Sequence, residues 1–207
     1  MIYNHMFMCQ VRDVDDLVSF AGGTIENRER DIIILHLKKD CFSTIPEIEF
    51  EKIKGILRDP YVLSVLVIDC EVSMSLYEKM HVFDLCCVSE HGALRYDPDN
   101  RTALRFLRLL FAPKYFVREE ARIMEYEELI SHGFVNVLLR KDSFYEDLES
   151  QILSLTLDRT KEQLHGIKDC MNAYKDWCLL GERPLTDLET GYFCKLALLK
   201  TEVNKKR

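Results

Sequence analysis

Cysteines could form disulfide bonds in this chain, and cysteines together with histidines could bind zinc. No cysteines form a C-x-x-C pair, and no cysteines and histidines stand at the spacing of a four-ligand zinc site. His36 and His81 fall within a predicted strand and at a predicted helix end, where core or capping roles are favoured. We expect free thiols, no metal and a reducing, cytoplasmic compartment. The cysteines are Cys9, Cys41, Cys70, Cys86, Cys87, Cys170, Cys178 and Cys194.

Ser75 and Glu78 have the spacing of a capping box. A serine at the N-cap and a glutamate three residues later pair with N–H groups that a helix start leaves unsatisfied. A glutamate can instead transfer protons where its surroundings perturb it, and both interpretations stay open. Asp97 belongs to Asp-Pro-Asp-Asn, a pattern typical of a turn.

Three arginines, Arg101, Arg105 and Arg108, share one face of a predicted helix. Guanidinium groups on one face could contact phosphates. A solvated helix face is the favoured interpretation. Asp84 opens a buried strand, where we expect it to pair with nearby backbone groups.

Near-continuous apolar runs predict four buried strands, at 32–37, 62–68, 82–88 and 134–139. Helical spacing of apolar residues separates them. Strands that are apolar on both faces and alternate with helices form a parallel sheet covered on both sides, so the fold class is α/β. The predicted helices lie around 14–21, 48–56, 75–81, 103–111 and 127–131, followed by 143–156, 159–179 and 185–200.

The composition suits one domain with a helical appendage. The chain has 207 residues, 47% of them apolar and 30% charged, and its formal net charge is -7. Binding to nucleic acids or anionic membranes needs a cationic face, and the acidic composition argues against one, so we expect neither as a partner. The N-terminus has no features of a secretory signal, and no segment has the length of a membrane span.

Three segments, in order and spacing, resemble the crotonase superfamily, which includes enoyl-CoA hydratases and isomerases. The segment Phe42-Ser-Thr-Ile-Pro-Glu-Ile48 is similar to the family's F-[SA]-A-G-A-D-[LI]. The stretch from Val65 to Glu78 is similar to a strand followed by G-x-x-x-G-G-G-x-E-L-A, and Asp84 follows six residues after the glutamate, as in the family. Tyr126–Val137 is similar to the ending A-x-x-A-x-x-x-G-L-V-x-x-V.

The resemblance implies a spiral of ββα-type units, with residues 1–142 as the core and residues 143–207 as a C-terminal helical region. It also implies a homotrimer or a hexamer, with the C-terminal helices at the interface. The implied partner is an acyl-CoA or an acyl-carrier protein, and a CoA thioester would be a substrate rather than a resident cofactor.

The resemblance further implies an oxyanion hole of two backbone amides, which stabilises the enolate formed from a thioester. By position these donors are Thr44 and Ser75. The two carboxylates that transfer protons in the hydratases correspond to Glu78 and Asp97. The implied function is that of a divergent enoyl-CoA hydratase or isomerase.

Two alternatives stay open. The chain could be a non-catalytic crotonase-fold subunit of a biosynthetic complex, because non-glycine residues beside the donors, such as Ile45, Met74 and Leu76, would crowd a thioester. It could also be a serine hydrolase, because Clp-type peptidases share this fold. Their nucleophile segment is similar to Val72-Ser73-Met74-Ser75. Their histidine is on the strand that follows, where His91 lies in this chain.

Overall fold

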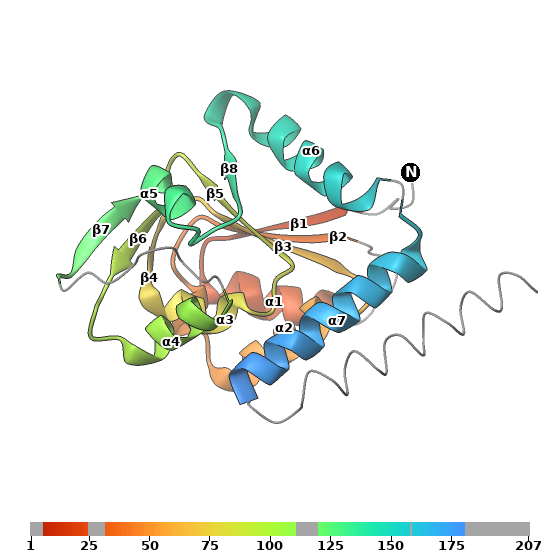
Figure 1. Ribbon diagram of the computed structural model, residues 1–207, viewed down its shortest axis with the longest axis horizontal. Coiled ribbons are helices and arrows are strands. Elements are labelled where there is room, and N and C mark those ends of the chain that lie inside the picture. The colour runs from red at the N-terminus through yellow and green to blue at the C-terminus, as the bar shows by residue number, and fades with distance from the viewer. Residues whose placement is uncertain (1–5, 25–31, 111–119, 158, 181–207) are drawn as a thin grey trace, which may run out of the picture.

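A five-stranded parallel sheet forms the centre of the molecule in the computed structural model (Figure 1). The residues that the structure describes are 6–24, 32–110, 120–157 and 159–180. The strand order is β1-β2-β3-β5-β8. These strands are β1 (Met6–Val11), β2 (Ile32–Leu37), β3 (Leu63–Ile68), β5 (Leu85–Ser89) and β8 (Val137–Leu139).

The pairing follows from strands that are apolar on both faces. All six residues of β2 are buried. β2 pairs with β3 in parallel, with Ile32 opposite Leu63, and β3 pairs with β5 in parallel, with Val65 opposite Leu85. A strand buried on both faces must be covered by helices on both sides. The predicted parallel α/β sheet, with the second and third predicted strands as neighbours, is therefore confirmed.

A second, three-stranded sheet was not predicted from the sequence. It has the order β4-β6-β7 and consists of β4 (Glu71–Ser73), β6 (Ala93–Tyr96) and β7 (Arg122–Glu125). β4 and β6 are parallel, whereas β6 and β7 are antiparallel. Strands of three or four residues are too short to show a hydrophobic period, so the sequence pattern could not reveal them.

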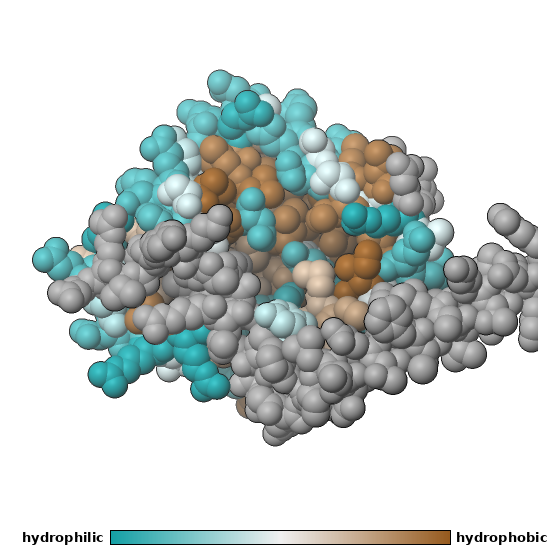
Figure 2. Space-filling view, in the orientation of Figure 1, coloured by the Kyte–Doolittle hydropathy of each residue, from teal (hydrophilic) through white to brown (hydrophobic). Residues whose placement is uncertain are grey.

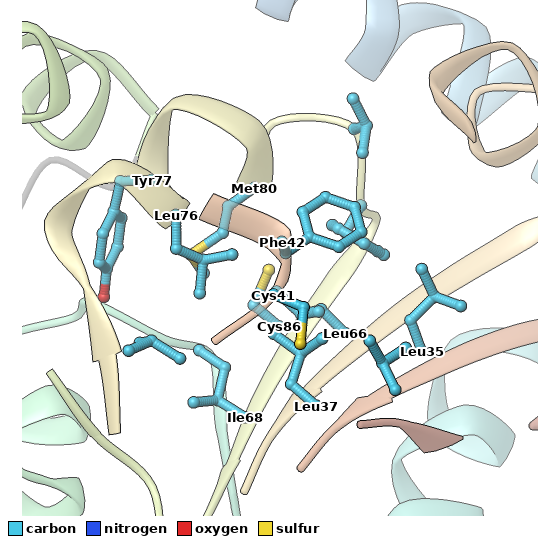
Figure 3. Packing of buried hydrophobic residues seen from close by; sticks show 14 of the residues in the cluster. Leu35, Leu37, Cys41, Phe42, Leu66, Ile68, Leu76, Tyr77, Met80 and Cys86 are labelled. Atoms are coloured by element: carbon cyan, nitrogen blue, oxygen red, sulfur yellow. The ribbon is translucent and has the colours of Figure 1, made fainter. Parts of the chain in front are cut away.

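Helices cover both faces of the large sheet. On one face, α1 (Val14–Thr24) and α2 (Glu47–Leu57) enclose the main hydrophobic cluster, into which Phe42, Leu76 and Met80 also point (Figures 1 and 3). On the other face, α6 (Phe144–Thr156) covers a smaller cluster (Figure 1). The other helices are α3 (Tyr77–Met80), α4 (Arg101–Leu110), α5 (Tyr126–Ser131) and α7 (Lys161–Leu180).

Several element ends differ from the prediction. The predicted helix at 75–81 is a tight turn, η2 (Met74–Leu76), that continues into α3. Gly133 follows α5 with a φ of 73°, which confirms it as the residue that ends this helix. The predicted helix at 185–200 lies outside the described residues. Within the described part of the chain, no helix combines the length and apolar character needed to cross a bilayer.

Candidate active site

Two short turns meet beyond the carboxyl ends of the central strands. η1 (Phe42–Thr44) follows β2, and η2 follows β4. Asp40 joins them, because its Oδ1 accepts the Ser43 hydroxyl at 2.6 Å and its Oδ2 accepts the Ser73 N–H at 2.7 Å. Lys79 Nζ adds a second link by donating to the carbonyls of Ser43, at 3.2 Å, and Ile45, at 3.3 Å. The structure thus brings together the segments that carry Thr44 and Ser75.

Thr44 is exposed at the end of η1. Its N–H donates to the Cys41 carbonyl at 3.3 Å, and its hydroxyl donates to the same oxygen at 3.2 Å. A backbone bond of this length is at the weak end of the usual range. The amide could therefore turn to a stronger acceptor at modest cost, but in this structure it is engaged within its own turn.

Ser75 lies in the middle of η2 and is half-buried. Its Oγ is 3.5 Å from Asn100 Nδ2. The Asn100 side chain also caps α4, since its Oδ1 accepts the Ala103 N–H at 3.0 Å. Asn100 therefore holds the start of α4 beside the second predicted oxyanion donor.

The predicted capping box at Ser75 and Glu78 is wrong. The N-cap residues are Ser73 for η2 and Leu76 for α3, and neither makes a side-chain capping hydrogen bond. The reason is that η2 runs directly into α3, so Ser75 is already inside a helical turn. The Glu78 carboxylate is half-buried and makes no hydrogen bond to any described residue.

Asp97 occupies the turn that its sequence pattern indicated. Its side chain is exposed, and its Oδ1 accepts the Asp99 N–H at 2.9 Å. Its carbonyl accepts the Asn100 N–H at 3.3 Å. The carboxylate is thus used to shape the turn before α4, and Asn100 connects this turn to η2 through its hydrogen bond to Ser75.

The apolar neighbours of the predicted donors point into the protein. Ile45 is 4%, Met74 1% and Leu76 0% exposed, and all three belong to the main hydrophobic cluster. Figure 3 shows Leu76 beside Met80 within that cluster. These side chains anchor the two turns to the core from beneath. Ser75 and Glu78 are left at half-buried positions above them, with Thr44 exposed.

The geometry gives no support to a serine hydrolase. Ser73 uses its backbone N–H to bind Asp40, and it lies opposite Arg95 in the small sheet. His91 is exposed, and its backbone N–H donates to Ser89 Oγ at 3.1 Å. No hydrogen bond joins Ser73 to His91 among the described residues.

A buried polar cluster at the ends of β2, β3 and β5 was missed by the sequence analysis. His36 Nε2 lies 3.0 Å from Asp69 Oδ2, and Lys38 and Ser89 also bond to Asp69. Burial alone would raise the pKa of Asp69, but the hydrogen bonds from Lys38, Ser89 and His36 outweigh it and lower that pKa. The available signal was a polar residue directly after an apolar strand. His36 is 3% exposed, which confirms it as a core residue.

Asp84 also has the structural role expected of it. Its Oδ2 accepts the backbone N–H and the hydroxyl of Ser64, both at 2.8 Å. The same oxygen accepts Lys168 Nζ at 2.8 Å. No group of three or more histidine, cysteine or acidic side chains within the described ranges could hold a metal ion.

Comparison with solved structures agrees with this architecture. An enoyl-CoA hydratase/isomerase family member has a TM-score of 0.65 at 11% identity, with 95% of this chain and 87% of that chain covered. An enoyl-CoA hydratase/isomerase from Marinobacter aquaeolei has a TM-score of 0.63 at 11% identity, covering 96% and 83%. A protein from Thermobifida fusca YX, in complex with acetoacetyl-CoA, has a TM-score of 0.57 at 11% identity, covering 91% and 84%.

These comparisons identify the fold. No protein-family model and no curated protein matches the sequence. The chain therefore has the fold of the crotonase superfamily in a strongly divergent sequence. The predicted fold class is confirmed, and the activity is a separate matter that the residues of the site must decide.

Proposed function

We propose that the chain binds an acyl thioester, carried by CoA or an acyl-carrier protein, at the junction of η1 and η2, and that Glu78 transfers a proton there. The observation that carries this proposal is the Glu78 carboxylate. It is half-buried, lies one turn after Ser75, and is used neither by a cap nor by a hydrogen bond to a described residue. The acetoacetyl-CoA held by a protein of the same fold supports the choice of ligand class.

The chemistry needs two amide donors and one base. Removing a proton from the carbon next to the thioester carbonyl places negative charge on the carbonyl oxygen, which backbone N–H groups stabilise. Ser75 and Thr44 would donate to this oxygen. Thr44 must first release the Cys41 carbonyl, and its 3.3 Å bond is long enough to be exchanged for a charge-assisted one.

A single carboxylate favours isomerisation over hydration. Adding water to a double bond requires one group to activate the water and another to protonate carbon, and Asp97 is occupied in its turn. In an isomerisation, Glu78 would take a proton from C2 of a 3-enoyl thioester and return one to C4. The double bond then moves from C3–C4 to C2–C3, and atoms and charge balance without a co-reactant.

A non-catalytic partner subunit is the second candidate. The observation in its favour is that the Thr44 N–H already has an acceptor in its own turn. In such a subunit the two turns would be structural, and the function would lie in binding another protein of a biosynthetic complex.

The test is turnover of trans-3-hexenoyl-CoA, followed by the absorbance of the conjugated product. We expect wild-type turnover that falls by about 10²–10⁴-fold in Glu78→Gln, because the amide cannot accept the proton. Glu47→Gln, an exposed glutamate in the first turn of α2, is the matched control and should keep full activity. If the wild type neither turns over this substrate nor gains thermal stability from CoA, the partner subunit becomes the better account.

A further inference from the structure

A cavity of about 270 Å³ lies along α7, at the opposite end of α3 from Ser75. Its walls include Met80, Phe83 and Met171, and its polar groups include His81, Asp84 and Lys175. Met80 and Phe83 are almost fully buried, whereas Met171 is 37% exposed. A dry cavity of about 150 Å³ is enough to bind benzene, so this one can hold a ligand with a single ring.

Two of the residues that line this cavity carry a hydrogen-bond acceptor. The Asp84 side chain is 7% exposed, and its Oδ1 has no hydrogen-bond partner among the described residues, although Oδ2 is bonded. His81 Nδ1 lies 2.9 Å from the Glu78 carbonyl, which can only accept, so the proton is on Nδ1 and Nε2 keeps a free lone pair. Burial lowers the pKa of His81 to about 4, and the ring is neutral near pH 7.

Two lysines of α7 reach this region and differ in their bonding. Lys168 Nζ donates to three oxygens, the carbonyls of Leu57 and Val62 and the Asp84 carboxylate. Burial lowers the pKa of Lys168, and the Asp84 carboxylate opposes this effect. The three bonds use all three protons of the ammonium, so losing one proton would break a bond. Lys175 Nζ donates to one oxygen in the described part of the chain, the Phe83 carbonyl at 2.8 Å. Its nitrogen can lose a proton without breaking a network.

Burial and nearby charges shift the pKa of Lys175 in opposite directions. Burial is the main effect and lowers the pKa of Lys175, Asp84 raises it, and Lys168 and Arg58 lower it further. His81 is neutral, and burial raises the pKa of the Cys86 thiol to about 12, so neither adds charge near pH 7. A lysine amine that is desolvated and close to other cations is the usual form of a nucleophilic lysine.

We infer that Lys175 is the reactive amine of a second site, which takes a small aldehyde or ketone with an apolar body and binds it reversibly as an imine. The neutral amine attacks the carbonyl carbon, a C–N bond forms, and a proton moves from nitrogen to oxygen. The carbinolamine then loses water as the C=N bond forms, so the step needs no oxidant or reductant. His81 Nε2 and Asp84 Oδ1 are the acceptors placed to relay the proton, and the apolar walls hold the remainder of the ligand.

Reductive trapping tests this site directly. Wild-type protein is incubated near pH 7 with benzaldehyde and sodium cyanoborohydride, and the benzylated lysines are located by peptide mapping with mass spectrometry. We expect Lys175 to carry the largest share of the label, ahead of exposed lysines such as Lys141. At a pH below the pKa of an amine, lowering that pKa by one unit raises the neutral fraction of the amine about tenfold. The share on Lys175 should therefore fall as the pH rises and ordinary lysines deprotonate.

Two variants sharpen the result. Lys175→Arg keeps the positive charge and removes the reactive amine, so the dominant label should disappear. Lys79→Arg is the matched control, because Lys79 is also half-buried but bonds to two carbonyls at the other site. It should leave the labelling of Lys175 unchanged. The inference is overturned if Lys175 of the wild type is labelled no faster than the exposed lysines. This comparison uses the wild type alone, so it does not depend on whether any variant folds.

Discussion

His81 makes the stability of the fold depend on pH. It is 8% exposed, and burial lowers its pKa from 6.5 to about 4. The unfolded chain therefore binds this proton more readily than the folded one. A lowered folded pKa gives stability that is fully present above the unfolded value and is lost as the pH falls toward the folded value. We expect a loss of about 3 kcal/mol from this group between about pH 7 and pH 4.

The measurement is urea unfolding across this pH range for the wild type and His81→Gln. The glutamine does not titrate, so its free energy of unfolding should fall less steeply with acid. His165→Gln is the control, because His165 lies on α7 and is only half-buried. Parallel pH profiles for the wild type and His81→Gln would show that His81 is not the source of the dependence.

At the residue scale, the sequence predicted the structural roles of two polar residues correctly and one helix cap wrongly. It placed His36 in the core and Asp84 among backbone groups, because a polar residue within an apolar strand has to be satisfied. It failed at Ser75, because a capping box requires an extended N-cap residue, and only the structure shows that η2 begins at Met74. The contact that joins the site, Asp40 to Ser73, links residues 33 positions apart and leaves no local signal.

Polar anchors hold α7 against the end of α2. Arg58 makes two hydrogen bonds to Asp176, at 2.8 and 2.9 Å, and Lys168 reaches two carbonyls and Asp84. Lys168→Met would leave the Asp84 carboxylate buried without its cation. We expect this variant to lose about 3–5 kcal/mol of stability, the usual effect of breaking one partner of a buried pair.

A double-variant cycle checks this account of α7. Asp84→Asn removes the charge that Lys168 balances, so adding it to Lys168→Met should cost less than the two single losses combined. Lys161→Met changes an exposed lysine at the start of the same helix and should have an effect within about 0.5 kcal/mol. Strictly additive losses in chemical denaturation would contradict the pairing.

At the element scale, the long apolar strands could be predicted and the short ones could not. β2 and β3 each have six residues, and burial on both faces makes them stand out in sequence. β4 has three residues and exists because β6 pairs with it, and the paired residues are 22 positions apart in the chain. β1, with the pattern Met-Phe-Met-Cys-Gln-Val, was also missed, since it is a half-buried edge strand and contains only one β-branched residue.

At the scale of the whole molecule, we propose that residues 1–142 form the core and residues 143–207 a helical region that covers it. α6 supports this division, because its Leu148 and Ile152 pack over Ile34 and Val65 of the sheet. A chain ended after residue 142 should therefore expose an apolar sheet face and aggregate. Light scattering would check this, and a monodisperse truncated protein would contradict it.

The assembly should be a trimer or a dimer of trimers. Apolar side chains remain exposed on α6 and α7, and Figure 2 shows apolar surface between these helices. Apolar patches on helices without a partner are typical of interfaces. Native mass spectrometry at micromolar concentration should give the mass of three or six chains, and a strictly monomeric mass would be the contrary result. Away from the cavity at Lys175, the exposed apolar residues in the described part of these helices include Tyr145, Leu153 and Ile167, and Leu157 directly follows α6.

The central claim is that the amides of Thr44 and Ser75 receive a thioester carbonyl. The most direct measurement is a crystal structure of the protein with a non-reactive analogue of a 3-enoyl-CoA thioester. We predict the carbonyl oxygen at about 2.7–3.1 Å from both backbone nitrogens, with the Thr44 N–H released from Cys41 and the Glu78 carboxylate facing C2. An analogue bound elsewhere, or Thr44 still bonded to Cys41 beside an empty junction at saturating analogue, would contradict the account.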